Sequence, residues 1–82
     1  MASTAETQEL VRYLVTSLVD SPETLVVQVS ETDQSVTFAV TLDPDDIGKV
    51  IGRQGRIIKA IRTLARAAGS TDNKQIEVEV VG

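Results

Sequence analysis

The spacing of apolar residues switches between a helical and an alternating period along the chain, and the order of these switches constrains the fold most. From Ser3 to about Asp20, leucines and valines recur every three to four residues, which predicts an amphipathic helix. Ser3 and Glu6 have the form of a capping box, in which each side chain satisfies a backbone N–H of the first turn. Ser21-Pro22 is expected to end the helix, because the residue before a proline avoids helical backbone angles.

Alternating apolar residues follow this helix in two stretches. Leu25 to Ser30 and Val36 to Leu42 alternate, and the polar break Glu31 to Gln34 between them is short enough for a hairpin. The two stretches are therefore predicted to be antiparallel strands. Gln75 to Val80 alternate again, and two glutamates occupy polar positions there, which predicts a last strand with an acidic outer face.

Two helices are predicted between the second and third strands. Asp43-Pro44-Asp45-Asp46 is a compact helix start, with its first residue as the N-cap and the proline at the first helical position. The short helix runs through Ile47 to Ile51 and stops at Gly52, and a longer helix follows from about Arg56 to Ala68. Gly69 is expected to close the longer helix as a left-handed C-cap.

This order of elements, α-β-β-α-α-β, predicts an α+β fold. A hairpin makes the first two strands antiparallel, and a crossover through two helices allows the second and third strands to be parallel. We expect a three-stranded mixed sheet with three helices on one face, because the strands alternate as a sheet with one solvated face requires. The chain has 82 residues, which is enough for one domain, placed at residues 1–82 with a core from about 5 to 81.

Positive charge is concentrated in one segment of a chain whose net charge is −4. Six of the eight Lys and Arg residues lie between Asp46 and Asp72, where the sequence has no acidic residue. A basic segment is the usual electrostatic footprint of nucleic-acid binding, although a solvated helix face without a partner can have the same composition. The six residues are Lys49, Arg53, Arg56, Lys59, Arg62 and Arg66.

Composition argues against most enzyme classes. The chain contains no cysteine and no histidine, which removes thiolate nucleophiles, histidine-based catalysis and structural zinc. Asp43, Asp45 and Asp46 are better explained as a helix start than as a catalytic or metal site, and the glycines match no nucleotide-binding motif. We therefore expect no enzyme activity, no cofactor, no metal and no small-molecule substrate.

The same composition indicates a cytoplasmic protein. There is no disulfide framework, the first residues lack the features of a secretion signal, and no apolar run approaches the roughly 20 residues needed to cross a bilayer. We expect no association with a membrane.

The four residues Gly52-Arg53-Gln54-Gly55 join the two central helices within the basic segment. Glycine reaches the backbone angles of such a turn without a Cβ clash and lets a ligand approach closely. The start of the following helix offers unpaired N–H groups and partial positive charge, which favour a phosphate there. An isolated pair of glycines at this spacing more often serves only a tight turn. The surrounding sequence therefore has to indicate whether this loop also binds a ligand.

That surrounding sequence, Ile47 to Ile58, closely resembles the I-G-x-x-G core of KH domains. The order of elements resembles the type II, bacterial, form of the KH fold, and residues 5 to 81 resemble the small stand-alone KH proteins of the KhpA type. The resemblance implies a protein that grips about four nucleotides of single-stranded RNA, with the glycine loop clamping the RNA backbone. Such proteins are viewed as RNA chaperones or post-transcriptional regulators, linked in Gram-positive bacteria to cell-envelope and cell-shape control.

The resemblance also assigns RNA-binding residues, position by position. The two middle residues of the glycine loop would face the phosphates, and the groove would be floored by the adjoining helices and the central strand around Val36 to Val40. Bases would lie on aliphatic surface, because the chain lacks the aromatic platform on which other modules stack bases. The expected site consists of Gly48, Lys49, Ile51, Gly52, Arg53, Gln54, Gly55, Arg56, Lys59 and Arg62.

Partners follow from the same resemblance. It implies a homodimer, and a heterodimer with a larger KH protein of the KhpB (Jag/EloR) type. Exposed aliphatic residues on the helix from Ile57 to Ala68 are one candidate surface for this pairing. The alternative to RNA binding is a KH-fold interaction module whose basic helix docks on an acidic protein. The arginine between two intact loop glycines favours RNA.

Overall fold

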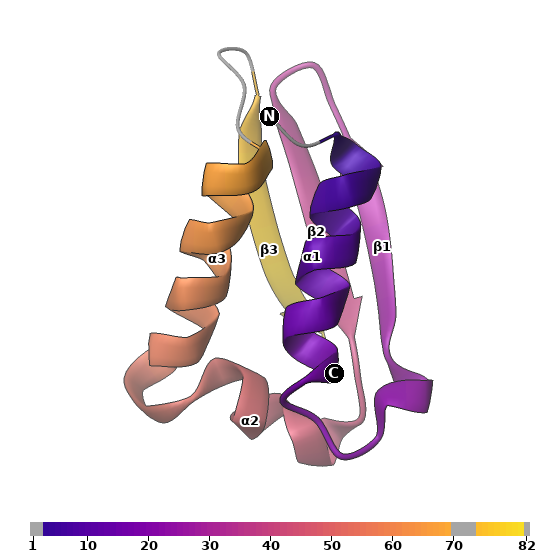
Figure 1. The fold of residues 1–82 in the computed structure, drawn as a ribbon, viewed down its shortest axis with the longest axis vertical. Helices are drawn as coiled ribbons and strands as arrows, with labels where there is room; N and C mark the ends of the chain where they lie inside the picture. Colours follow the sequence, from indigo (N-terminus) through magenta and orange to yellow (C-terminus); the bar gives the residue numbers. More distant parts are fainter. Residues whose placement is uncertain (1–2, 70–73, 82) are drawn as a thin grey trace.

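The computed structural model describes residues 3–69 and 74–81, and its elements follow the predicted order (Figure 1). The helices are α1 (Thr4–Thr16), α2 (Ile47–Ile51) and α3 (Arg56–Gly69). The strands are β1 (Val26–Glu31), β2 (Ser35–Thr41) and β3 (Gln75–Val81). Short 3₁₀ turns, η1 (Pro22–Thr24), η2 (Pro44–Asp46) and η3 (Arg53–Gly55), lie in the connections.

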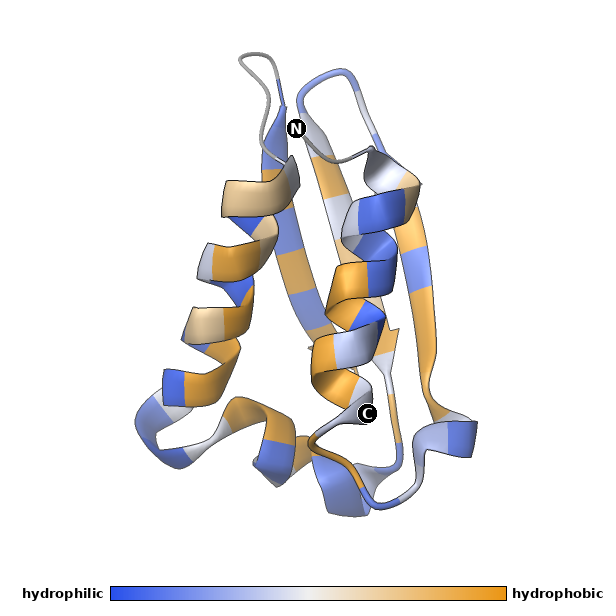
Figure 2. Ribbon diagram, viewed as in Figure 1, coloured by the Kyte–Doolittle hydropathy of each residue, from blue (hydrophilic) through white to orange (hydrophobic). Residues whose placement is uncertain are grey.

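The three strands form one mixed sheet in the order β1-β2-β3, as expected. β1 pairs antiparallel with β2, so that Val29 lies opposite Phe38, and β2 pairs parallel with β3, so that Phe38 also lies opposite Val78. This register places the buried apolar residues of all three strands on one face, and the resulting alternation is visible along β3 in Figure 2. The helices α1 and α3 lie side by side over the sheet, and α2 lies at the end of this helical layer (Figure 1).

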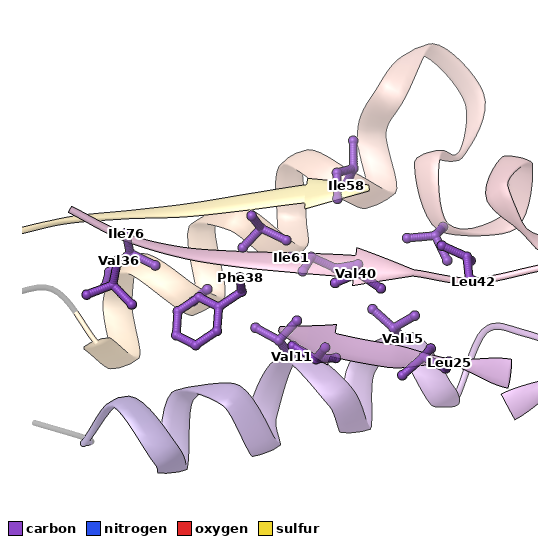
Figure 3. Close-up of a cluster of buried hydrophobic side chains, with 14 residues drawn as sticks. Val11, Val15, Leu25, Val36, Phe38, Val40, Leu42, Ile58, Ile61 and Ile76 are labelled. Atoms are coloured by element: carbon purple, nitrogen blue, oxygen red, sulfur yellow. The ribbon is translucent and has the colours of Figure 1, made fainter. Parts of the chain in front are cut away.

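Aliphatic side chains of the helices meet the apolar face of the sheet around Phe38 (Figure 3). Phe38 and Val40 of β2 and Val11 and Val15 of α1 have no exposed surface. Full burial of an apolar side chain of this kind is worth roughly 1.5–3 kcal/mol. Val50 of α2 belongs to the same cluster and is also fully buried. The core therefore anchors the short helix that leads into the glycine loop.

The helix α1 begins with the predicted capping box and ends earlier than predicted. Oγ of Ser3 accepts the N–H of Glu6 at 3.2 Å, and Oε1 of Glu6 accepts the N–H of Ser3 at 3.1 Å. The last helical residue is Thr16, and the hydroxyl of Ser17 donates to a carbonyl oxygen one turn earlier at 2.8 Å. The N–H of Leu18 then donates to the carbonyl of Val15, only three residues earlier, so the helix ends before Ser21-Pro22 is reached.

Gly69 is the last residue of α3, but its backbone is not left-handed. A Cβ atom at this position would lie 2.6 Å from Oγ1 of Thr7 on α1. Glycine is therefore needed for the close approach of two helices and not for a special backbone angle. The prediction of a left-handed C-cap at this residue is wrong.

Candidate nucleic-acid interface

Three residues in the loop between α2 and α3 have positive φ angles. They are Gly52 (φ 76°, ψ 174°), Gln54 (φ 58°, ψ 23°) and Gly55 (φ 72°). The angles at Gly52 are almost exclusive to glycine, and a Cβ atom there would lie 2.6 Å from Cγ1 of Ile57. The glycines thus let α2 turn into α3 within four residues, at one end of the molecule (Figure 1).

The backbone N–H groups of this loop differ in whether they have a hydrogen-bond acceptor. The N–H of Gly52 donates back into α2 at 2.9 Å, and the N–H of Gly55 donates to the carbonyl of Gly52 at 3.1 Å. Within the described residues, the N–H groups of Arg53 and Gln54 have no backbone acceptor. Both side chains are exposed, and Nη2 of Arg56 donates to Oε1 of Gln54 at 3.2 Å. Successive N–H groups at a change from right-handed to left-handed backbone form a concavity that suits an anion.

Basic side chains continue from this loop along one side of α3. Arg56 and Lys59 are exposed. In the part of the chain that the structure describes, neither of them, nor Arg53, has a carboxylate within 4.0 Å. Their charges are therefore available to an external anion.

Arg62 and Arg66 tie α3 to the free edge of β3. Nε of Arg62 donates to the carbonyl oxygen of Val78 at 3.2 Å, and Nε of Arg66 donates to that of Ile76 at 3.3 Å. The alternate residues of β3 bond to β2, so these two carbonyls point away from the sheet. A guanidinium has five N–H donors, and each of these contacts uses one of them. The contacts fix the direction of both side chains and leave donors for a further acceptor.

The strand that borders these arginines is β3 and not the central strand. Val36, Phe38 and Val40 of β2 are at most 3% exposed, because their side chains point into the core beneath the helices. They cannot form the floor of a groove, so the expectation that this stretch of the central strand lies under the bound bases is wrong.

Asp46 is buried and joins the start of α2 to the connection after α1. Its carboxylate accepts the N–H of Asp20 at 3.2 Å, the N–H of Ser21 at 3.1 Å and Nζ of Lys49 at 3.2 Å. Burial by itself raises the pKa of Asp46, but these three hydrogen bonds outweigh it and hold the pKa below its ordinary value. Lys49 also pairs with Asp20, and its hydrogen bonds to the two carboxylates raise its pKa. The charge of Lys49 is thus already balanced within the chain.

Most of the expected site residues lie at the loop end of the molecule, whereas Arg62 lies farther along α3 beside Val78. Asp46, and Arg66 beside Ile76, are two residues that sequence reasoning missed. Gly48 is exposed on α2 and Ile51 is half-buried at its end. Asp46 was explained only as part of a helix start, and its backbone partners lie 26 and 25 positions earlier, where no local pattern reveals them. Arg66 follows Arg62 by four residues on the same helix face, and that spacing was a usable signal.

A three-stranded mixed sheet reached in the order α-β-β-α-α-β, with a glycine loop between its second and third helices, is the architecture of a type II KH domain. The chain belongs to the KhpA/KhpB KH-domain family, whose model matches residues 8–80.

Curated relatives share most of their length with this chain. RNA-binding protein KhpA of Listeria monocytogenes serovar 1/2a is 47% identical over 74 residues, which cover 90% of this chain and 97% of the relative. RNA-binding protein KhpA of Clostridium perfringens is 45% identical over 74 residues, covering 90% and 99%. RNA-binding protein KhpA of Bacillus subtilis is 42% identical over 73 residues, covering 89% and 90%.

A solved structure has the same fold. The crystal structure of Era in complex with MgGDPNP and nucleotides 1506–1542 of 16S ribosomal RNA matches 92% of this chain and 30% of that chain. The TM-score is 0.62 and the sequence identity is 19%, so this likeness concerns the fold alone.

Two kinds of feature are absent from residues 3–69 and 74–81. No helix there has the length and apolar character needed to span a membrane. No group of three or more acidic side chains there is arranged to hold a metal ion.

Proposed function

We propose that the chain binds single-stranded RNA by holding the RNA backbone on its glycine loop. The observation that carries this proposal is the pair of N–H groups at Arg53 and Gln54, which, like the cationic side chains beside them, have no partner of opposite character among residues 3–69 and 74–81. Phosphate oxygens accept strong hydrogen bonds from backbone N–H and guanidinium groups. Relatives that are 42–47% identical and named RNA-binding proteins support RNA as the ligand.

The path of the RNA follows from the direction of the charges. Phosphates that leave the loop would pass Arg56, Lys59 and Arg62 along α3, in that order. Bases would rest on half-buried aliphatic side chains, such as Ile51 and Ile57. Because no aromatic side chain is available there, the roughly 1–3 kcal/mol that each stacked base contributes elsewhere is absent. A single copy should therefore bind weakly.

Fluorescence anisotropy of short labelled single-stranded RNAs, at low and at physiological salt, tests this proposal. The Arg53→Asp, Gln54→Asp variant places two carboxylates against the phosphates, and we expect affinity to fall at least about tenfold, because charged hydrogen bonds become charge repulsion. Aspartate is comparatively well tolerated at a positive φ, so the fold should persist at position 54. Circular dichroism checks that it does.

A matched control has the same change of residue types elsewhere. Arg12→Asp on α1 and Gln34→Asp in the exposed hairpin turn alter the net charge by the same amount. Retained affinity in the loop variant, or equal losses in both variants, would exclude the backbone clamp. If the natural chain bound no RNA even at low salt, that result would favour the alternative function, an interaction module that docks on an acidic protein.

We further propose that the domain works as a pair, with a second copy or with a KhpB-type KH protein. Leu64 of α3 is 48% exposed, and Tyr13 of the neighbouring helix α1 is 70% exposed. Covering these side chains would remove apolar surface from water. Sedimentation of the natural chain and of Leu64→Lys tests this surface: association that survives the substitution would place the interface elsewhere.

The physiological role that we propose is that of a non-enzymatic RNA chaperone or post-transcriptional regulator in the bacterial cytoplasm. RNA strand-annealing assays with the natural chain and with the loop variant test it. Annealing that does not depend on the loop would contradict a chaperone role for this site.

A further inference from the structure

The ion pair between Lys49 and Asp20 lies close to the glycine loop and has no role in the clamp described above. We propose that Asp20 competes with RNA phosphate for Lys49 and thereby sets the affinity of the site for single-stranded RNA. The inference rests on the proposed RNA binding. Lys49 lies on α2, one helical turn before Gly52, whereas Asp20 lies in the connection between α1 and η1.

The two carboxylates that contact Lys49 are held in different ways. Asp46 is 2% exposed, and its oxygen atoms also accept two backbone N–H groups. The side chain of Asp20 is 81% exposed, and within the described residues its carboxylate contacts Lys49 alone. The carboxylate of Asp46 is therefore fixed by its hydrogen bonds to the backbone. The carboxylate of Asp20 can leave Lys49 without breaking another hydrogen bond.

The ammonium group of Lys49 can exchange one partner for another. It has three N–H donors, of which Asp46 takes one and Asp20 takes another. The Lys49 side chain is 43% exposed, so a phosphate oxygen can approach it from solvent. An ion pair with so exposed a carboxylate is weak enough to be replaced by a phosphate. The negative charge of Asp20 opposes the same approach.

This competition is specific to one position of the basic face. In the part of the chain that the structure describes, Arg53, Arg56 and Lys59 have no carboxylate within salt-bridge distance. On this face, among the residues that the structure describes, removing an acid therefore frees a cation only at Lys49. The expected gain in RNA affinity is a local effect of the Asp20 charge. An equal change in net charge elsewhere should not reproduce it.

Asp20→Asn tests the proposal, because it removes the charge and keeps the shape of the side chain. In salt-series anisotropy with labelled single-stranded RNA, we expect about two- to fivefold tighter binding at low salt, which corresponds to the release of one exposed ion pair. The plot of log affinity against log salt should become steeper by about 0.7, the value for one additional phosphate contact on a single strand. Glu23→Gln is the matched control, because Glu23 is exposed, carries the same charge and does not contact Lys49.

A second background separates the local effect from long-range electrostatics. In a Lys49→Gln chain there is no ammonium group to release. In that chain, Asp20→Asn should therefore raise the affinity for RNA no more than Glu23→Gln does. Equal gains from Asp20→Asn and Glu23→Gln in the natural chain, or a gain from Asp20→Asn that persists in the Lys49→Gln chain, would refute the proposal. If RNA binding depends on the glycine loop and yet Asp20→Asn behaves like its control, this inference alone fails. If the natural chain binds no RNA, the inference fails together with the proposed function.

Discussion

Gly48 and Gly52 are four residues apart, yet an added methyl group would meet different surroundings at each. At Gly52, φ is +76° and a Cβ atom would lie 2.6–2.9 Å from three carbon atoms of Ile57. At Gly48, apart from the adjoining residues and the backbone of its own helix, no atom would lie within 4 Å of such a Cβ. We expect Gly52→Ala to lower the free energy of unfolding by about 2–4 kcal/mol, through backbone strain and overpacking. Gly48→Ala, inside a helix, should raise it by about 0.5–1 kcal/mol. Urea denaturation measures the unfolding free energy of both variants. Equal losses of stability would contradict the conclusion that glycine is required at Gly52 and not at Gly48.

Asp46 should make the stability of the fold depend on pH. Its hydrogen bonds to Lys49 and to the N–H groups of Asp20 and Ser21 keep its pKa below the ordinary value of 3.8. A carboxyl group with a lowered pKa in the folded state contributes stability that is complete above its unfolded pKa and is lost as pH falls through its folded pKa. The natural chain should therefore exceed Asp46→Asn in unfolding free energy by a constant amount near neutral pH, and the excess should shrink below about pH 4. Urea denaturation across this range measures it, and an excess that persists unchanged in acid would rule out this role.

The sequence predicts the type and order of the helices and strands, because periodicity and caps are local signals. It does not predict features that depend on distant residues. The carboxylate of Asp46 takes the N–H groups of Asp20 and Ser21, which helps to place the connection after α1. Gly69 is explained by Thr7 on another helix. The expectation that β2 forms the floor of the groove is wrong for the same reason. No local pattern predicts that β3, and not β2, borders Arg62 and Arg66 of α3.

The close approach of α1 and α3 at Thr7 and Gly69 gives a prediction for the contact between these two helices. A Cβ atom at Gly69 would lie 2.6 Å from Oγ1 and 3.2 Å from Cγ2 of Thr7, which is 1% exposed. Gly69→Ala should therefore lower the free energy of unfolding by about 1–3 kcal/mol, as overpacking does. In a Thr7→Ala background both colliding atoms are gone, so the same substitution should cost much less. A double-mutant cycle by urea denaturation measures the difference, and an equal cost in both backgrounds would show that the helices do not meet in this way.

At the scale of the whole molecule, most of the basic residues and the two glutamates of β3 lie on different sides. The basic residues follow the glycine loop and α3, whereas Glu77 and Glu79 alternate with the buried residues of β3 and lie on the face of the sheet away from the helices. At physiological ionic strength, exposed charges are screened beyond about 8 Å. RNA at the loop therefore responds mainly to the local cations and much less to the net charge of −4.

This separation predicts that the position of a lost positive charge matters more than the number lost. Lys59→Gln with Arg62→Gln should weaken binding to all single-stranded RNAs and make the salt dependence shallower by about 0.7 for each lost phosphate contact. Arg12→Gln with Lys74→Gln gives the same net charge but removes the two basic residues outside the basic segment, one of which pairs with Glu31 at 2.5 Å. Its salt dependence should stay that of the natural chain. Anisotropy over a salt series measures both slopes: an unchanged slope in the first variant would mean that this side of α3 is only solvated, and equal changes in both would mean that net charge governs binding.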